Sequence, residues 1–327
     1  MEVVFARGMA QLAERVAALG AKRVLVLAPP SRRFVEQVTA ALAAFEPAVF
    51  DGAQVHVPAE VVDAAAAKLA ETRADTVVAI GGGSPIGLAK ALKLRGELRS
   101  VALPTTYAGS EMTTMYGITR GASKQTGRDP RVRPDLVWYD VTLTQGLPIG
   151  LSVQSLCNAI AHVISVASTG SILGTVRAEG FAATAQTIRA IEELLVAPTD
   201  LRAREDAQRG ASACAAVYEQ GKAGLQHQLA HLLGGATRLD HAAIHACLLP
   251  HFVAYLRETQ PALVDELEAA LGRPSLAAYL RDVLVRAGAP ISLAALGATR
   301  EAVTTALATR PELPARVALA AYDNSYL

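Results

Sequence analysis

The sequence predicts an α/β domain with a doubly wound parallel sheet, followed by an all-α domain. The chain has 327 residues, more than one hydrophobic core usually holds, so we expect two domains. In the first part, short β-type runs alternate with amphipathic helical segments, whereas from about Leu151 onward only long Ala/Leu-rich segments follow. Gly146 and Pro148 mark the transition, and we divide the chain into residues 1–149 and 150–327.

Strands and helices are predicted to alternate along the first domain. The strands are expected within residues 22–30, 47–52, 75–82 and 99–106, and the helices within residues 11–19, 31–45, 58–72 and 85–94. Gly20 suits the carboxyl cap of the first helix. Strands joined by helices favour right-handed crossovers and therefore a parallel sheet.

The second domain is predicted to contain helices alone. Long helices are expected over residues 152–168, 175–196 and 201–219, and helical segments continue to the end of the chain. No convincing strand pattern interrupts them.

Composition argues against several classes of protein. A net charge of +1 and 5% aromatic residues give neither a basic stripe nor stacking surfaces, so no nucleic-acid partner is expected. Three widely spaced cysteines, Cys157, Cys214 and Cys247, suit buried thiols in a reducing compartment. We recognise no leader at the amino terminus and no apolar run of membrane-spanning length. We therefore expect a cytoplasmic protein with no membrane partner.

A run of three glycines separates a strand from a helix in "VVAIGGGSPIGLAKAL", Val77 to Leu92. The glycines form either a flexible turn or a loop whose backbone N–H groups approach a phosphate at the positive end of the helix. The spacing is neither G-x-G-x-x-G nor a Walker loop. In the second interpretation, the binding residues are Gly81, Gly82, Gly83 and Ser84.

A second polar segment, "LPTTYAGSEMT", begins at the next predicted strand end. Ligands of open α/β sheets lie outside the carboxyl ends of the strands, so both motifs point to one crevice. Its candidate cofactor-binding residues are Thr105, Thr106, Tyr107 and Ser110. The alternative is that these hydroxyl groups cap a helix or stabilise a turn.

The strand within residues 22–30 lacks the acidic residue that usually binds an adenosine ribose. It is followed by Ser31, Arg32 and Arg33 instead. A cationic strand end is compatible with the 2′-phosphate of NADPH, and the alternative is two solvated arginines at a helix start. The choice between NADPH and NADH stays open.

The histidines of the second domain occur at helical spacing. Six of the seven histidines lie there: His162, His227, His231, His241, His245 and His251. "NAIAH" places Asn158 one turn from His162, and "HQLAH" and "HAAIH" repeat that spacing. Converging imidazoles bind a divalent metal or supply acid–base groups.

A metal site built from these pairs would use His162, His227 and His241, with position 158 as the fourth ligand. That position is Asn158, whose neutral amide oxygen is a poor substitute for a carboxylate. We therefore favour a metal-free site.

Together the motifs "GGGSPIGLAKAL", "LPTTYAGSEMT", "KQTGRDPRV", "NAIAH", "HQLAHLLGG" and "HAAIHACLLPH" resemble the iron-containing alcohol dehydrogenase superfamily, and within it most closely the maleylacetate reductases. The resemblance covers nearly the whole chain. It implies a dehydroquinate synthase-like fold, NADPH or NADH between the two domains, a small-molecule substrate and a homodimer. The metal ligands of the superfamily correspond to Asn158, His162, His227 and His241, and maleylacetate reductases also carry asparagine at the first.

By this resemblance, the expected reaction transfers hydride from nicotinamide to a carbon conjugated to a carbonyl, while an imidazole supplies a proton. His231, His241 and His245 are the candidates for that proton transfer. Substrate carboxylates would be bound by Lys124, Arg128 and Lys222; for the first two the alternative is a solvated loop.

The segment after His162, "VISVASTGSILG", departs from that of its relatives and favours a specialised enzyme in a biosynthetic pathway. The leading hypothesis is a metal-independent reductase of a small unsaturated oxo-acid. A metal-dependent alcohol dehydrogenase remains an alternative. So does a non-redox cyclase, dehydratase or isomerase on the same scaffold, because a fold does not fix a function.

Overall fold

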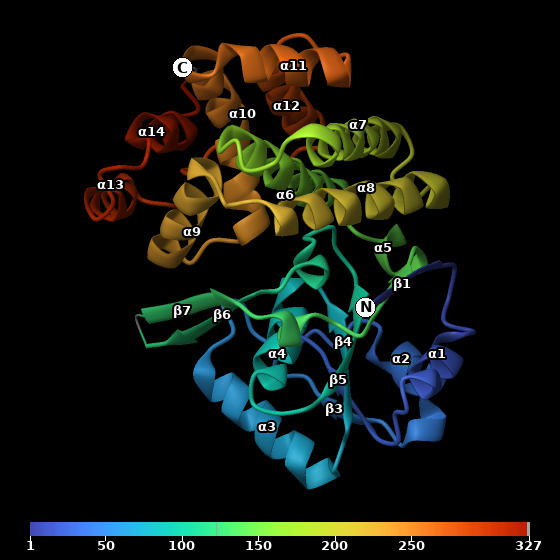
Figure 1. Ribbon diagram of the computed structural model, residues 1–327. Coiled ribbons are helices and arrows are strands. Elements are labelled where there is room, and N and C mark those ends of the chain that lie inside the picture. Colours follow the sequence, from blue (N-terminus) through green and yellow to red (C-terminus); the bar gives the residue numbers. More distant parts are fainter. Residues whose placement is uncertain (122, 326–327) are drawn as a thin grey trace. The chain divides into compact units, whose positions relative to one another are not determined.

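The computed structural model describes residues 1–121 and 123–325, which form two compact units, Met1–Gly146 and Leu147–Leu327. The first unit contains a parallel sheet with helices on both faces, and the second is helical (Figure 1). Both predicted fold classes are confirmed. The observed division after Gly146 lies close to the boundary after residue 149 that the sequence suggested.

The sheet of the first unit has six parallel strands in the order β1-β8-β5-β4-β2-β3. They are β1 (Glu2–Ala6), β2 (Val24–Leu27), β3 (Ala48–Phe50), β4 (Thr76–Gly81), β5 (Arg99–Pro104) and β8 (Leu136–Asp140). From β2 the chain continues to β3 on one side, whereas from β4 it continues to β5 on the other. The adjacent strands β2 and β4 therefore flank a topological switch point, where open α/β sheets bind ligands.

Alternate residues of the central strands face opposite sides, so each face of the sheet builds its own core. One core packs Val24 and Val26 against the helices α1 (Leu12–Ala18) and α2 (Val35–Ala41). The other packs Leu25 and Leu27 against α3 (Ala59–Thr72) and α4 (Gly83–Lys93). Figure 1 shows these helix pairs on the two sides of the sheet.

Several elements of this unit escaped the sequence prediction. They are the strands β1 and β8, the antiparallel hairpin of β6 (Met115–Arg120) and β7 (Ser123–Arg128), the short helix α5 (Thr142–Gln145) and the 3-10 turns η1 (Ala43–Phe45), η2 (Ser110–Met112) and η3 (Pro130–Val132). The helix expected over residues 31–45 starts only at Val35, so that prediction was wrong at its amino end. Arg32 and Phe34 have φ angles of 54° and 68°, which are incompatible with a right-handed helix.

The second unit consists of nine helices within the described residues. They are α6 (Ile149–Ser168), α7 (Gly174–Val196), α8 (Leu201–Gln220), α9 (Leu225–Thr237), α10 (His241–Thr259), α11 (Pro261–Leu271), α12 (Leu276–Arg286), α13 (Arg300–Ala308) and α14 (Ala315–Asp323). Helix α6 packs against α7, α8, α9, α10 and α12. It is therefore the core helix of this unit.

Helix α6 corrects one expectation, because its 20 residues are long and apolar enough to cross a membrane. However, 83% of its apolar window is buried inside the protein. The surrounding helices account for that apolarity, as they do for the core helix of a globular unit.

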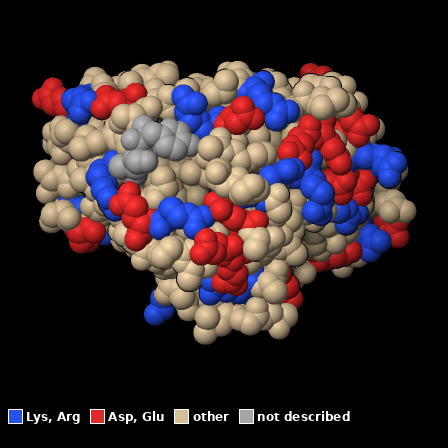
Figure 2. Space-filling view, turned by 90° about the horizontal axis from the view of Figure 1, so that it is seen from above, with Lys and Arg blue, Asp and Glu red and all other residues tan. Residues whose placement is uncertain are grey.

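Charged side chains of both signs mix on the surface. On the face shown in Figure 2, basic and acidic side chains are interspersed. Several of the second unit's arginines pair with carboxylates; for example, Arg273 contacts Glu192, and Arg257 contacts Glu268. Such mixing lowers the local field that a phosphate backbone would meet.

Candidate functional site

The glycine loop leaves the sheet at Gly81, the last residue of β4. Its φ of +145° belongs to a region that side chains rarely adopt, and an added Cβ would lie 2.8 Å from Cγ of Pro85. A Cβ on Gly82 would approach Thr106 to 3.2 Å. Glycine at position 81 is thus required by the backbone.

Helix α4 begins directly after the loop, with Gly82 at its N-cap. Glycine has no side chain, so the N-cap residue cannot cap the first N–H groups of the helix. A Cβ on Gly83 would meet nothing within 4 Å. Open space beside the first N–H groups, at the positive end of the helix, fits a pyrophosphate.

The polar segment after β5 lies beside this loop, as the sequence suggested. The amide of Thr105 donates to the carbonyl of Gly81 at 3.0 Å, and Thr106 packs on Gly82. Tyr107 is buried, while Ser84 and Ser110 are partly exposed. The structure brings both motifs together at the carboxyl ends of the neighbouring strands β4 and β5. Their contact with a cofactor stays a prediction.

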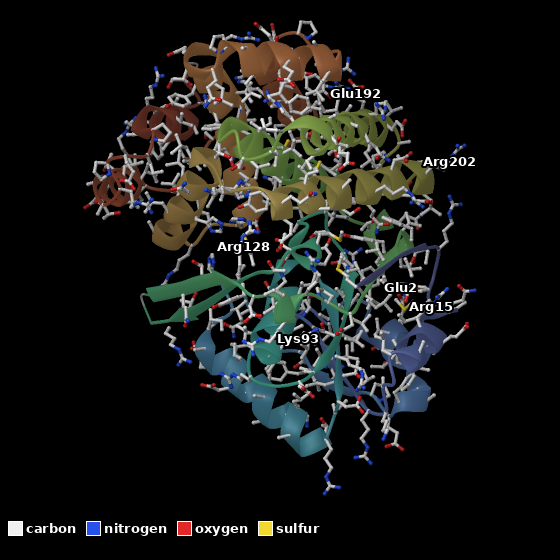
Figure 3. The ribbon with its side chains drawn as sticks, in the orientation of Figure 1. Glu2, Arg15, Lys93, Arg128, Glu192 and Arg202 are labelled. Atoms are coloured by element: carbon white, nitrogen blue, oxygen red, sulfur yellow. The ribbon has the colours of Figure 1, made fainter. Side chains whose placement is uncertain are left out.

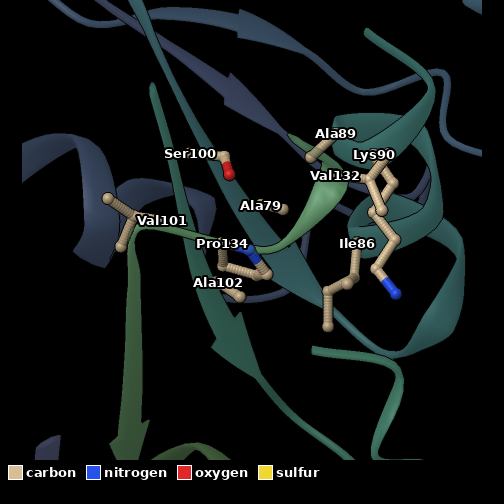
Figure 4. Close-up of a pocket in the computed structure, with 9 residues that line it drawn as sticks. All are labelled: Ala79, Ile86, Ala89, Lys90, Ser100, Val101, Ala102, Val132 and Pro134. Carbon is tan, nitrogen blue, oxygen red and sulfur yellow. The ribbon is translucent and has the colours of Figure 1, made fainter. Parts of the chain in front are cut away.

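Lys90 connects these segments and was not singled out from the sequence. Its side chain is 2% exposed, and its ammonium donates to the carbonyls of Ser110 (2.5 Å) and Met115 (2.8 Å) and to Oγ1 of Thr113 (3.1 Å). Figure 4 shows Lys90 at the edge of an apolar space between α4 and the sheet, which has no room for a water molecule. The lysine therefore secures the loop after η2 to α4.

A buried carboxyl group completes this polar cluster. Glu111 is 2% exposed, and the hydroxyl of Tyr139 donates to its Oε1 at 2.7 Å. Burial raises the pKa of Glu111, although the Tyr139 hydrogen bond and the charge of Lys90 oppose the shift. Lysine and glutamate are usually exposed, so nothing in their spacing signalled this role.

Five of the six histidines of the second unit form one continuous cluster. His162 comes from α6, His227 and His231 from α9, and His241 and His245 from α10. Neighbouring ring centroids are 4.2–5.0 Å apart along the order His162, His227, His245, His241 and His231. Tyr218 of α8, which the sequence analysis missed, stacks on His162 at 4.7 Å. The imidazoles of the three helical pairs thus converge.

Hydrogen bonds determine which ring nitrogens of His241 and His245 donate and which accept. Gln226 places its amide nitrogen 3.5 Å from the carbonyl of His245 and its Oε1 3.1 Å from Nδ1 of His245. Since Oε1 only accepts, Nδ1 of His245 carries the proton and its Nε2 is the acceptor in the neutral ring. That Nε2 lies 3.1 Å from Nε2 of His241, so His241 donates.

Burial decides which imidazoles are neutral. It lowers the pKa of His162 to about 3, with a smaller contribution from His231. Burial and the neighbouring rings also hold the pKa values of His227 and His245 well below the usual 6.5. His241 is partly exposed and His231 is exposed. Proton exchange with a ligand is therefore open to the last two rings.

The donor set does not match a divalent-metal site. Asn158 is 1% exposed and offers only a neutral amide, and Nε2 of His241 is directed to His245. Within residues 1–121 and 123–325, no group of three or more His, Cys, Asp or Glu side chains is arranged to hold a metal ion. Among the same residues, the buried Nδ1 atoms of His162 and His227 have no hydrogen-bond partner.

The three expected substrate cations are not brought together by what the structure describes. Arg128 is exposed on β7 in the first unit (Figure 3), so the predicted loop is a hairpin strand. Lys222 is exposed in the second unit, and its backbone N–H donates to Oγ of Ser171 at 2.9 Å. The side chain of Lys124 lies outside the described residues.

Comparison with known proteins identifies the family. The domain "Iron-containing alcohol dehydrogenase" matches residues 1–141, and "Fe-containing alcohol dehydrogenase family, C-terminal" matches residues 152–312. The chain belongs to the iron-containing alcohol dehydrogenase family. The resemblance noted from the motifs is thereby confirmed, and this member of the family is an NAD(P)H-dependent oxidoreductase.

Individual relatives within the family are maleylacetate reductases. The chain is 44% identical over 300 residues to that of Pseudomonas sp. (strain P51), covering 90% of this chain and 84% of the relative. It is 40% identical over 319 residues to maleylacetate reductase 1 of Cupriavidus pinatubonensis, covering 95% and 89%. The crystal structure of the enzyme from Agrobacterium tumefaciens matches with a TM-score of 0.87 at 35% identity, covering 100% of this chain and 97% of that one.

Proposed function

We propose that this enzyme reduces a small unsaturated oxo-acid of the maleylacetate type with NADPH or NADH, using histidine acid catalysis and no metal. The observation that carries the proposal is the hydrogen-bonded series from Gln226 through His245 to His241. Because Nε2–H of His241 is donated to the neutral His245, the partly exposed His241 ring delivers a proton through its other nitrogen, Nδ1, when it is protonated. That is the arrangement general acid catalysis requires.

When bound, the dihydronicotinamide supplies a hydride to a substrate carbon conjugated to a carbonyl group. The electron pair of the reduced double bond moves to the carbonyl oxygen and gives an enolate. The protonated His241 ring stabilises that oxygen by hydrogen bonding and donates its Nδ1 proton to it, which gives the enol. The enol takes up a solvent proton at the α-carbon and releases its O–H proton to solvent, which gives the saturated ketone, and one solvent proton restores the His241 ring. The net balance is one hydride and one proton added across the double bond.

The other imidazoles and Gln226 orient the proposed proton donor and keep further positive charge away from it. His245 accepts the hydrogen bond from His241 and holds its ring orientation, while Gln226 holds that of His245. The neutral state of His162 and His227 avoids a second positive charge beside the proton donor. Lys222 and Arg128 are proposed to meet the substrate carboxylates, because cationic donors pair strongly with carboxylates.

The relatives support the choice of substrate class. Those described above are named maleylacetate reductases, and they align with 90% or more of this chain. The replacement of a carboxylate by Asn158 supports the metal-free reaction, since it removes the charge that would offset a divalent ion.

The proposal is tested by following NADPH and NADH oxidation with maleylacetate, using protein freed of metal by a chelator. We expect activity to survive metal removal and to fall about 10²- to 10⁴-fold in kcat for His241→Gln, with nucleotide affinity nearly unchanged. His251→Gln on the same helix is the matched control, and its activity should stay near that of the unmodified enzyme.

Two outcomes would overturn this proposal. Loss of turnover on chelation, restored by zinc or iron, would indicate a metal-dependent alcohol dehydrogenase. Unchanged kcat in His241→Gln would remove this residue from the reaction.

A further inference from the structure

The serines that follow His162 have no role in the proposed reaction, but they contact a loop that does. Ser165 lies on α6, about one turn beyond His162, and is fully buried. Ser171 lies in the turn after the same helix and is partly exposed. Both side chains bond to the loop that joins α8 to α9, residues 221–224, which contains Lys222.

Two hydroxyl groups hold the backbone of this loop. Oγ of Ser171 accepts the N–H of Lys222 at 2.9 Å. Oγ of Ser165 accepts the N–H of Gly224, the N-cap residue of α9, at 2.8 Å. The backbone is thus held on both sides of Ala223 by side chains from one segment of the chain.

The loop backbone also packs directly on α6, because its two glycines leave no room for side chains. A Cβ on Gly221 would lie 2.6 Å from Cβ of Val166. A Cβ on Gly224 would lie 2.4 Å from the carbonyl oxygen of Ser165. Both distances are shorter than real Cβ contacts. Such close packing restricts the backbone movement of Lys222, which lies between the two glycines.

Burial explains one of the two hydrogen bonds but not the other. Gly224 is buried, so its N–H needs an acceptor inside the protein. Lys222 is exposed, so its N–H could bond to water instead. Stability alone therefore does not require the hydroxyl of Ser171.

The ammonium group of Lys222 is available to a ligand. Among the described residues, no carboxylate lies within ion-pair distance of it. Other basic side chains of the second unit, such as Arg209 and Arg257, pair with glutamates. A lysine whose backbone is already fixed loses less entropy when it binds an anion.

We propose that Ser171 and Ser165 are positioning residues that hold Lys222 in place for a substrate carboxylate. The inference rests on the proposed function, because it takes Lys222 as a cation that meets the substrate. Ser165 also fixes the start of α9, three residues before His227, whose ring centroid lies 5.0 Å from that of His162. Neither hydroxyl touches the reacting atoms.

The two serines should affect different kinetic constants. Ser171 fixes the loop backbone at the cation, so its loss should weaken substrate binding and raise KM. Ser165 fixes the first turn of α9 as well, which carries His227, so its loss should raise KM and also lower kcat. A general loss of stability would not separate the two constants in this way.

The test is a double-mutant cycle on Ser171→Ala and Lys222→Met, in which oxidation of NADPH or NADH is followed at varied maleylacetate concentration. We expect each single variant to raise KM about three- to tenfold, with kcat within about twofold. The double variant should match Lys222→Met alone, because Ser171 then has no cation to position. Ser165→Ala should raise KM and lower kcat about threefold or more.

Ser292→Ala is the matched control, because Oγ of Ser292 also accepts a backbone N–H, that of Ala295 at 3.1 Å, in the segment after α12. It should leave KM and kcat unchanged. Additive increases of KM in the double variant, or an unchanged KM in any of the three single variants, would overturn the inference while leaving the reductase proposal standing. Failure of the unmodified protein to oxidise either cofactor with maleylacetate would overturn the reductase proposal itself.

Discussion

The two units carry their chemistry in different ways. In Met1–Gly146 the candidate site is built from backbone, at the glycine loop and the start of α4. In Leu147–Leu327 it is built from side chains, as five imidazoles contributed by α6, α9 and α10. A backbone site depends on strand register and on whatever holds its loops, whereas a side-chain site depends on ring orientation.

This difference predicts different sensitivities to mutation. The first site should fail when a buried group that secures a loop is removed, even if that group never touches a ligand. The second should fail when a ring loses its orienting partner, while the fold persists. Substitutions at Lys90 and Gln226 examine the two cases separately.

The largest effect is expected for Lys90→Met. The methionine leaves the carbonyls of Ser110 and Met115 without their buried donor and Glu111 without a nearby cation, at a cost of about 3–5 kcal/mol. Urea denaturation should show that loss of unfolding free energy. At temperatures where the variant remains folded, nucleotide affinity should fall by about tenfold or more.

Lys93→Met provides the control for that prediction. Lys93 lies one turn further along α4, is 8% exposed, and pairs with Asp135 at 2.8 Å (Figure 3). Its ammonium donates to the carbonyl of Arg133 and to the carboxylate of Asp135, away from the loop after η2. We expect Lys93→Met to lower the free energy of unfolding without a matching loss of nucleotide affinity. Equal losses of affinity in both variants would show that Lys90 acts through global stability alone.

The sequence predicted the parts of the first unit that follow from local pattern. The strands β2, β4 and β5 were found because their buried runs are bounded by turn residues. Strand β1 was missed because it is a five-residue segment at the sheet edge, whose partner β8 lies more than 100 residues away. Pairing at that distance leaves no local signal.

The next largest effect is expected for Gln226→Leu. Its loss leaves Nδ1–H of the buried His245 without an acceptor, which costs about 1–3 kcal/mol and favours the other tautomer. His245 would then turn a proton rather than a lone pair toward His241. We expect kcat to fall about 10- to 100-fold, measured by NADPH oxidation at saturating substrate.

Gln226→Glu is the informative companion, because a carboxylate restores the acceptor for His245. If ring orientation is what matters, this variant should recover most of the lost kcat while the leucine variant does not. Similar losses in both would contradict the orienting role. Nucleotide Kd values should be unchanged throughout, since Gln226 is fully buried and acts on the orientation of His245.

The candidate residues of the second unit were easier to predict than those that orient them. Residues at i and i+4 share a helix face. The spacing alone therefore identified two histidine pairs as candidate site residues, His227 with His231 and His241 with His245. Gln226 and Tyr218 gave no such signal, because one glutamine and one tyrosine fit many helical patterns. Their roles depend on which helices pack together, and that is fixed by the fold.

The smallest effect concerns the one histidine of the second unit outside the cluster. His251 on α10 is 2% exposed, and burial, with a smaller contribution from Arg281, lowers its pKa to about 4. Unfolded histidine protonates near 6.5, so between about pH 6.5 and 4 the unfolded chain binds more protons and the folded state loses stability as the pH falls. From pH 7.5 to 5.5 this residue should cost about 1 kcal/mol. The free energy of unfolding of His251→Gln, measured by urea denaturation, should therefore fall about 1 kcal/mol less over this pH range than that of the unmodified protein. An identical fall in both proteins would contradict the assignment. Because His251 is buried and lies outside the histidine cluster, its titration should leave nucleotide binding unaffected.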